Sequence, residues 1–191
     1  VHSRQPELSF PAMHIIIDGY NLIRQSDFLR HFERRSLEAG RQALLSQVSS
    51  YRKSKGHRIT VVFDGWENGS PFEERDRQGG ITVVYSRRGE KADEVIKRMV
   101  LQKGEEIVVV TSDRDVADYI SRKGATALTS PEFEEVIVRA AASAAVTAVA
   151  ERFPEKEEED DARESGNARK KGPAHRLSRR EKAAMTRRRK L

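Results

Sequence analysis

Five short apolar runs constrain the fold of this 191-residue chain more than any other feature of its sequence. They are mostly β-branched and continuous, without alternation of apolar and polar residues, and each ends in small or polar residues. The runs are HIIID (14–18), ITVVFDG (59–65), ITVVYS (81–86), EIVVVTSD (106–113) and ATALTS (125–130). Continuous runs of this length are typical of strands that are buried on both faces. We therefore expect five strands of a mostly parallel sheet.

Segments with helical periodicity lie between most of these runs. Apolar residues recur at helical spacing over 36–54, 91–103 and 114–123. Each segment is followed by a glycine that can end a helix, namely Gly56, Gly104 and Gly124. In the first segment, the spacing predicts that Leu37 lies on the buried face together with Leu44, Val48 and Tyr51.

The remaining segments complete the predicted architecture. An Ala-rich stretch over 131–152 predicts a last helix with Ser130 as its N-cap. The Gly- and Pro-containing connection over 66–80 is predicted to be a loop, and His57, directly after a helix, is predicted to lie at the surface without a role. Strands that alternate with helices predict an α/β fold, a three-layer α/β/α sandwich on a mostly parallel five-stranded sheet.

Charge is distributed unevenly along the chain, whose net charge is +6. Residues 155–164 contain seven acids and two bases, whereas residues 169–191 contain eleven bases and one acid. Such blocks cannot bury enough apolar surface to offset the entropy of ordering. We expect one domain over 13–152, an acidic linker over 153–168 and a disordered basic tail over 169–191, and we read no function in the leader, residues 1–12.

Composition excludes several classes of protein. The chain has no cysteine, which excludes disulfide scaffolds, Cys-ligated zinc, iron–sulfur clusters and thiol nucleophiles. No apolar run approaches the roughly 20 residues of a membrane span, and the leader lacks the apolar core of a secretory signal. These features predict a cytoplasmic protein.

Aspartates mark the ends of most of the predicted strands. Asp18 and Asp64 end the first two runs, Asp93 opens the helix after the third, and Asp113 and Asp115 follow the fourth. The carboxyl ends of parallel strands meet at one edge of the sheet, where function collects. Taken singly, an aspartate at a strand end is more simply explained as an Asx turn or an N-cap, and Asp93 has the alternative explanation of a partner of the helix dipole.

Several carboxylates at one edge favour a metal site, because close carboxylates raise each other's pKa unless a cation neutralises them. Asp93 shares a helical face with Ile96 and Val100, so we expect it to point toward the same edge as Asp18. Oxygen donors without Cys or a suitable His pair favour Mg²⁺ or Mn²⁺ over zinc. Such an ion suits phosphodiester hydrolysis.

Motifs of other phosphate-handling folds are absent from the sequence. It contains neither a GxxxxGK[ST] phosphate loop nor a GxGxxG after its first strand. The DRD of 113–115 would need a glutamate after an earlier strand to match a Toprim-like site, and that strand carries Asp18 instead. The acidic pair and the lysine of a receiver domain are also missing.

Four ordered motifs resemble the YacP-like branch of the NYN domains, which are relatives of the PIN-domain nucleases. The motifs are IIIDGYNLI (15–23), VVFDG (61–65), KADEVI (91–96) and VVVTSDRDVADYI (108–120). The resemblance covers about residues 13–140 and leaves both charged segments outside. It implies a PIN-like α/β/α fold and a Mg²⁺- or Mn²⁺-dependent endoribonuclease, with one branch associated with bacterial ribosomes and mRNA cleavage.

The resemblance also implies roles for single residues. By position, Asp18, Asp93 and Asp113 would be the metal-binding acids, with Asp115 as a further candidate. Asn21 in DGYN would orient the substrate or a metal-bound water. Asp64 would be either part of the site or the residue that holds the FDG turn.

Four basic residues flank the proposed site and are candidates for contacts with RNA phosphates: Arg87, Arg88, Lys91 and Arg114. Ordinary solvated surface explains each of them equally well, and Arg88 and Lys91, beside Asp93, are the favoured pair. Trp66 and Phe72 could stack on unpaired bases, although packing within their loop is the simpler expectation.

Three functions remain open from the sequence. The first is a metal-dependent endoribonuclease that acts on single-stranded RNA, with mRNA and the ribosome as its partners. The second is a catalytically silent RNA-binding module whose acids cap helices while the basic tail binds phosphates. The third is a phosphodiesterase of DNA or nucleotides on the same fold. They differ in their need for metal and in substrate.

Overall fold

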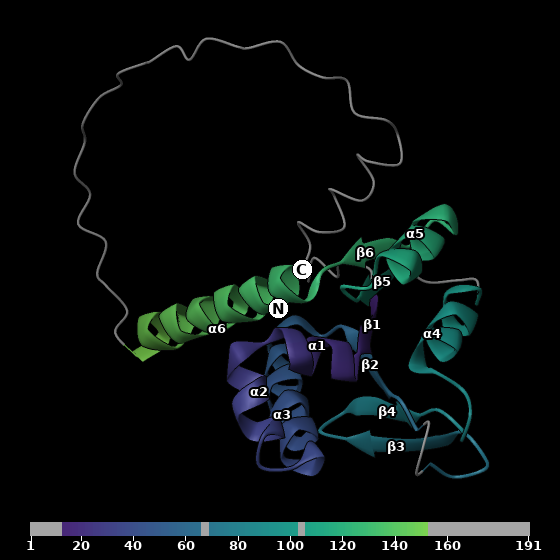
Figure 1. Cartoon of the computed structure of the whole chain (residues 1–191). Helices are drawn as coiled ribbons and strands as arrows, with labels where there is room; N and C mark the ends of the chain where they lie inside the picture. Colours follow the sequence, from purple (N-terminus) through teal and green to yellow (C-terminus); the bar gives the residue numbers. More distant parts are fainter. Residues whose placement is uncertain (1–12, 66–68, 103–105, 153–191) are drawn as a thin grey trace, which may run out of the picture.

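The computed structural model of the chain describes residues 13–65, 69–102 and 106–152. Within these ranges the elements are, in chain order, β1 (His14–Asp18), α1 (Gly19–Gln25), α2 (Asp27–Glu33), α3 (Leu37–Lys55), β2 (Arg58–Phe63), β3 (Glu74–Gln78), β4 (Ile81–Tyr85), α4 (Ala92–Val100), β5 (Ile107–Val110), α5 (Arg114–Arg122), β6 (Thr126–Leu128) and α6 (Ser130–Arg152) (Figure 1). Our predictions for the leader, Trp66, Gly104 and the two charged segments lie outside the described residues.

The sheet is built around β1. All five predicted runs form strands, and they pair in parallel in the order β4-β2-β1-β5-β6. β1 lies between β2 and β5, so that Ile16 pairs with Thr60 on one side and with Val109 on the other. The predicted α/β sandwich with a mostly parallel sheet is confirmed.

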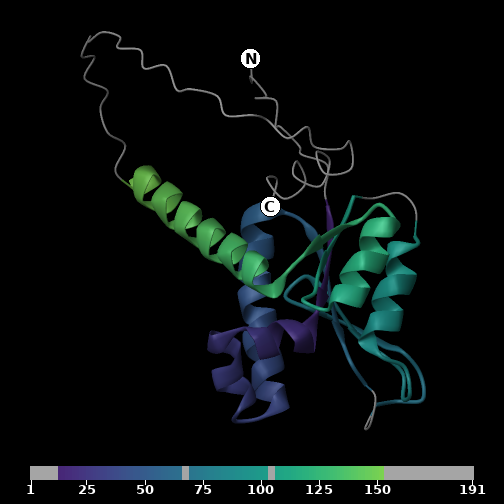
Figure 2. The same ribbon diagram turned by 45° about the horizontal axis from the view of Figure 1, so that its top comes forward.

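Helices cover both faces of the sheet and create two separate cores (Figures 1 and 2). On one face, α1, α2, α3 and α6 pack over Ile15 and Ile17 of β1. On the other face, α4 and α5 pack over Ile16. Successive residues of a strand point to opposite faces, so a strand covered on both faces is apolar at most positions, and a polar residue there needs a partner, as Thr60 has in His14 at 2.8 Å. This requirement explains why the runs are continuous.

A sixth strand, β3, lies in the segment that we predicted to be a loop. β3 pairs antiparallel with β4 at the edge of the sheet. Its sequence, ERDRQ, has no apolar residue, and its side chains are exposed or half-buried. Gly79 and Gly80, with φ values of 58° and 82°, form the tight turn between the two strands. Two glycines are suited to such a hairpin turn because both positions require positive φ.

Two short helices, α1 and α2, precede α3 and were not predicted. The Oδ1 of Asp18 caps α1 by accepting the N–H of Asn21 at 3.1 Å. The hydroxyl of Ser26 caps α2 by accepting the N–H of Leu29, also at 3.1 Å. Each helix has only seven residues, which is too short for the apolar periodicity of two turns to be recognised.

Three local predictions were wrong. Leu37 is 52% exposed, because it occupies the first position of α3, ahead of the turns that face the sheet. His57 is 5% exposed, since the left-handed Gly56 (φ 72°) ends α3 and turns the chain so that His57 lies against Tyr51, with ring centroids 6.3 Å apart. The third concerns the start of α6.

Thr129, not Ser130, caps α6. The carboxylate of Glu132 accepts both the N–H and the hydroxyl of Thr129 at 2.8 Å, and the N–H of Glu132 points back to the Thr129 hydroxyl at 3.4 Å. This is the reciprocal arrangement of a capping box. Ser130 is therefore the first helical residue, and it is fully buried.

The first half of helix α6 packs on the domain, and the helix then extends away from it. Phe133, Val136, Ile137 and Ala140 are buried in the core that α6 shares with α3, whereas residues 141–145 are exposed. Figure 2 shows the second half of α6 extending away from the sheet. Among the described residues, no helix combines the length and apolarity that crossing a membrane requires.

The close approach of α1 to β2 leaves no room for a side chain at Gly19. A Cβ at this position would lie 2.4 Å from Cε1 of the fully buried Phe63 ring. We expect Gly19→Ala to lower the free energy of unfolding by about 1–3 kcal/mol through overpacking, measured by urea denaturation. The double variant Gly19→Ala with Phe63→Leu should lose less stability than the sum of the losses in the two single variants, since the smaller side chain at position 63 makes room for the added Cβ. Simple additivity would contradict this interpretation.

Candidate functional site

The strand order creates a topological switch point at β1. From β1 the chain builds β2 and β4 on one side and then returns to build β5 and β6 on the other. In open α/β sheets, ligands bind in the crevice at the carboxyl ends of the strands where the order reverses. Asp18 is the last residue of β1, and Asp113 follows the end of β5, whose Val110 pairs with Ile17. Both aspartates therefore lie at this crevice.

Each of these two aspartates caps a helix with one carboxylate oxygen. Oδ1 of Asp18 accepts the N–H of Asn21 at the start of α1. Oδ1 of Asp113 accepts the N–H groups of Asp115 and Val116, at 2.8 and 3.1 Å, at the start of α5. In both cases Oδ2 takes no part in the cap. The capping function therefore fixes the orientation of each carboxylate and still leaves an oxygen for a ligand.

Asp18 is the most deeply buried of the candidate acids. It is 8% exposed, and burial raises the pKa of its carboxyl from 3.8 to about 6. The hydrogen bond from Asn21 and the charge of Arg24 oppose this rise in pKa, while the negative charges of Asp93 and Asp64 add to it. Asp64 thus lies near enough to Asp18 to act on it.

Asp93 connects the carboxylates of the two strand ends. It lies in the first turn of α4 and is half-buried. Burial, and then the negative charge of Asp113, raise the pKa of Asp93, whereas Lys97 and Lys91 lower it. The charge of Asp93 therefore raises the pKa of Asp18, and the charge of Asp113 raises the pKa of Asp93. The structure brings Asp18, Asp64, Asp93 and Asp113 to one edge of the sheet, as the sequence predicted.

The donor chemistry of this edge fits a hard divalent cation. Buried carboxylates that raise each other's pKa are stabilised when a cation neutralises them, and Mg²⁺ commonly binds through one or two carboxylates with water in its other positions. Within the described residues, no three acidic or histidine side chains are already gathered as a metal-binding group. The acidic edge therefore suits an ion that is bound by one or two carboxylates and keeps water in its other coordination positions.

Asp115 is exposed, like Asp113, but neither the pKa of Asp18 nor that of Asp93 responds to its charge. It lies in the first turn of α5, where its backbone N–H donates to Asp113. Arg114, the first residue of the same helix, is also exposed. The sequence placed both residues at the site by their proximity to Asp113, and the structure puts their side chains at its solvent side.

The side chain of Asn21 joins three segments that are distant in sequence. Its Oδ1 accepts the backbone N–H of Ser112 at 2.9 Å and the hydroxyl of Ser130 at 3.1 Å. The hydroxyl of Ser112 in turn accepts the N–H of Ser130 at 3.2 Å. Asn21 therefore ties α1, the segment after β5 and the start of α6 together beneath the acidic edge. We did not foresee this role from the sequence.

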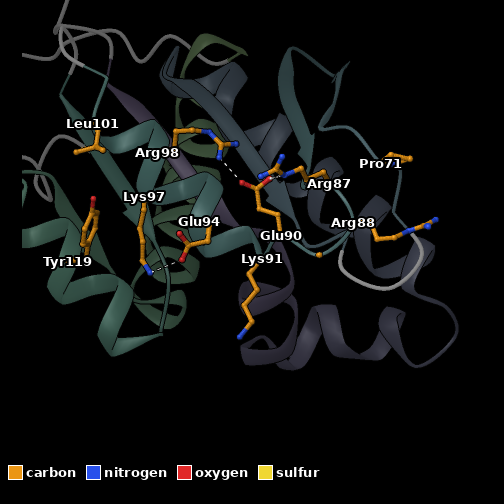
Figure 3. A pocket seen from close by; sticks show the side chains of 11 residues that line it. Pro71, Arg87, Arg88, Glu90, Lys91, Glu94, Lys97, Arg98, Leu101 and Tyr119 are labelled. Atoms are coloured by element: carbon orange, nitrogen blue, oxygen red, sulfur yellow. Dashed lines mark hydrogen bonds and ion pairs between the residues drawn. The ribbon is translucent and has the colours of Figure 1, made fainter.

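Three of the predicted basic residues line a common pocket. Arg87, Arg88 and Lys91 belong to the lining of a pocket of about 890 Å³ beside α4 (Figure 3). Arg114 is not among the described residues of this lining. The guanidinium of Arg87 lies 3.4 Å from the carboxylate of Glu90, so it is partly neutralised.

The pocket also contains residues that sequence reasoning missed. Arg98 donates to Glu90 at 2.6 Å and pairs with Glu73, which joins the segment before β3 to the segment before α4. Lys97 and Tyr119 line the same pocket from α4 and α5. Phe72, which we expected to pack within its loop, is 77% exposed, so that expectation was wrong.

The raised pKa of Asp18 predicts an unusual dependence of stability on pH. Between about pH 4 and 6 the folded protein binds a proton that the unfolded chain does not, so the free energy of unfolding should fall as the pH rises through this window. At pH 7.5 in EDTA we expect Asp18→Asn to be more stable than wild type by about 1–3 kcal/mol, since Asn removes the buried charge and keeps an oxygen to cap α1.

Urea denaturation at pH 5 and pH 7.5 measures this difference. Asp27→Asn, which neutralises a fully exposed aspartate, is the matched control and should leave the pH dependence as it is in wild type. A pH dependence in Asp18→Asn that parallels wild type would contradict the interpretation.

The contacts of Asn21 yield a second expectation. Asn21→Ala leaves the N–H of Ser112 without its acceptor, which should lower the free energy of unfolding by about 1–3 kcal/mol. Ser130→Ala removes only one donor and should cost less, because Asn21 keeps its bond with Ser112. Equal losses in the two variants, measured by urea denaturation, would disprove a central role for Asn21.

Known proteins share this fold. Two crystal structures of Rae1 (YacP) from Bacillus subtilis, one of them a point mutant, align with a TM-score of 0.59. The mutant is 25% identical and the alignment covers 69% of this chain and 78% of that one; the values for the other are 24%, 73% and 83%. The uncharacterized protein YacP of Bacillus subtilis (strain 168) is 28% identical over 102 residues, which span 52% of this chain and only 59% of that relative.

The sequence model of the YacP-like NYN domain matches residues 15–190. The match continues past residue 140, where we expected the resemblance to end, and takes in both charged segments. It includes all four motifs and every candidate site residue, and it supports a nuclease role. The chain belongs to the YacP-like NYN domain family.

Proposed function

We propose that this protein is a metal-dependent endoribonuclease that hydrolyses phosphodiester bonds in single-stranded RNA. The observation that carries the proposal is the convergence of Asp18, Asp93 and Asp113, from three separate elements, at the switch point of the sheet. Asp18 is buried, Asp93 half-buried and Asp113 exposed, and the electrostatic repulsion among them is unfavourable for the fold alone. A bound cation removes this repulsion. mRNA as substrate, and the ribosome as the place of action, extend the proposal on the basis of family resemblance.

Asp18, Asp93 and Asp113 would hold Mg²⁺ or Mn²⁺ through one or two carboxylates directly and otherwise through water that the ion retains. The ion would supply an activated water and neutralise charge on the phosphoryl oxygens. The chain itself prepares these ligands. The N–H of Asn21 orients Asp18, and two N–H groups at the start of α5 orient Asp113. Asp18 must lose its proton to bind a cation, so activity should rise with pH through about 6.

The basic residues near the acids support RNA as the substrate. Arg88 and Lys91 lie in the segment between β4 and α4, directly before Asp93. Their positive charges offset the repulsion between RNA phosphates and the carboxylates, which would otherwise oppose binding. Arg114, at the start of α5, offers a further exposed cation beside Asp113.

One observation favours the alternative of a silent RNA-binding module. Asp18 and Asp113 both cap helices, and a cap alone is a sufficient reason for an aspartate at these positions. Substitution by asparagine separates the two roles, because Asn keeps a capping oxygen and loses the charge that a divalent cation needs.

The deciding experiment is a cleavage assay on labelled single-stranded RNA with Mn²⁺, with Mg²⁺ and with EDTA. We expect cleavage only with a divalent cation, and Asp18→Asn, Asp93→Asn and Asp113→Asn should each lower the rate by at least about 100-fold, since each removes a proposed ligand. Asp27→Asn serves as the control. DNA and mononucleotides under the same conditions test the third possible function.

Binding measurements distinguish loss of catalysis from loss of the substrate. In the asparagine variants the affinity for RNA and the folded circular dichroism spectrum should be retained. Full cleavage by Asp18→Asn, or metal-independent cleavage by wild type, would overturn the proposal. Binding without any cleavage under all conditions would favour the silent module.

A further inference from the structure

The pocket beside α4, which we call the α4 groove, lies next to the acidic edge, although none of the four acids of that edge is among its described lining residues. One end is lined by Arg88 and Lys91, next to Asp93, and the other by Leu101 and Tyr119. The helical rise separates Lys91 from Leu101 by about 15 Å, several times the spacing of about 3.4 Å between stacked bases. The groove is therefore long enough for more than one nucleotide.

Tyr119 provides an aromatic surface at the far end of this groove. The side chain is half-buried and packs against the core that α4 and α5 share. The Nζ atoms of Lys97 and Lys123 lie 5.8 and 5.6 Å from the centre of its ring. Both lysines lie over the ring, so a base that stacks on it takes the place of a lysine side chain. The displaced ammonium group remains close enough to contact a neighbouring phosphate, and a ring anchored on a core in this way suits an unpaired base.

The groove retains positive charge along its length (Figure 3). Glu90 is occupied by Arg98 and Arg87, and these side chains compensate one another. The side chains of Arg88 and Lys91 form no ion pair with any of the described residues. Lys97 pairs with Glu94 at 3.2 Å on the exposed side of α4, where such a pair is weak and a phosphate can replace it.

We propose that the α4 groove is a subsite for single-stranded RNA, in which an unpaired base stacks on Tyr119 and neighbouring phosphates contact Lys97, Lys91 and Arg88. The subsite rests on the proposed nuclease function, because it guides the strand whose phosphate lies at the acidic edge. It selects single strands over duplexes, since the bases of a duplex are already stacked and paired.

The test measures binding alone, with the full chain carrying Asp18→Asn, in EDTA, and a short fluorescent oligoribonucleotide. Adding Tyr119→Ala should weaken binding about 5- to 150-fold, the range of one lost base stack. Tyr119→Phe keeps the ring and should keep the affinity. Phe28→Ala is the matched control, because Phe28 is a 59% exposed aromatic residue of α2, on the opposite face of the sheet.

Two further measurements separate stacking from folding and from general charge. Tyr119→Leu preserves the apolar contact with the core and should weaken binding like Tyr119→Ala, with an unchanged circular dichroism spectrum. Lys97→Ala should lower the slope of log affinity against log salt by about one, as expected for one lost phosphate contact.

Specific outcomes would overturn the subsite. These are unchanged affinity in Tyr119→Ala or Tyr119→Leu, a loss in Tyr119→Phe equal to that in Tyr119→Ala, or an equal loss of affinity for duplex RNA. A wild-type protein that binds RNA through Tyr119 and never cleaves it would overturn the nuclease function and leave the subsite standing. Cleavage by wild type together with full RNA affinity in Tyr119→Ala would overturn the subsite and leave the nuclease function standing.

Discussion

The parallel pairing of β1 with both β2 and β5 is the interaction on which the rest of this structure depends. Because β1 is central and covered on both faces, its last residue, Asp18, is held inside the protein instead of at its surface. The raised pKa of that carboxyl is a direct result of this burial. The same pairing brings the segment after β5, with Asp113, to the same edge. The gathering of these acidic side chains at one edge is thus a consequence of strand order.

The structural roles of Asp18 and Asp113 coincide with the chemical roles that we propose for them. Asp18 and Asp113 each begin a helix, and each does so with a single carboxylate oxygen. A capping bond restricts the side chain to one orientation. A carboxylate that is already oriented in this way can bind a cation without a further loss of side-chain entropy. Asn21 adds to this by holding three chain segments together beneath the acids. The fold therefore supports the site with the same bonds that stabilise its helix ends.

Much of the fold could be predicted from the sequence, because burial on both faces of a sheet imposes an apolar residue at most strand positions. β3 escaped prediction since an exposed edge strand carries no such pattern, although the pair Gly79–Gly80 is a recognisable hairpin signal. The convergence of Asp18, Asp93 and Asp113 could be predicted from strand ends and helix faces. The contacts of Asn21 and the place of Tyr119 in the α4 groove could not, because they join residues whose proximity only the tertiary structure creates.

The two edges of the sheet limit how this protein can associate with other chains. β3 presents the charged sequence ERDRQ at one edge, and β6 at the other has only three residues. Charged and short edge strands resist the addition of a further strand, which is a common route to aggregation and to peptide capture. Along the described part of the chain, binding partners are therefore expected to engage side-chain surfaces and helices, and the sheet remains closed to extension.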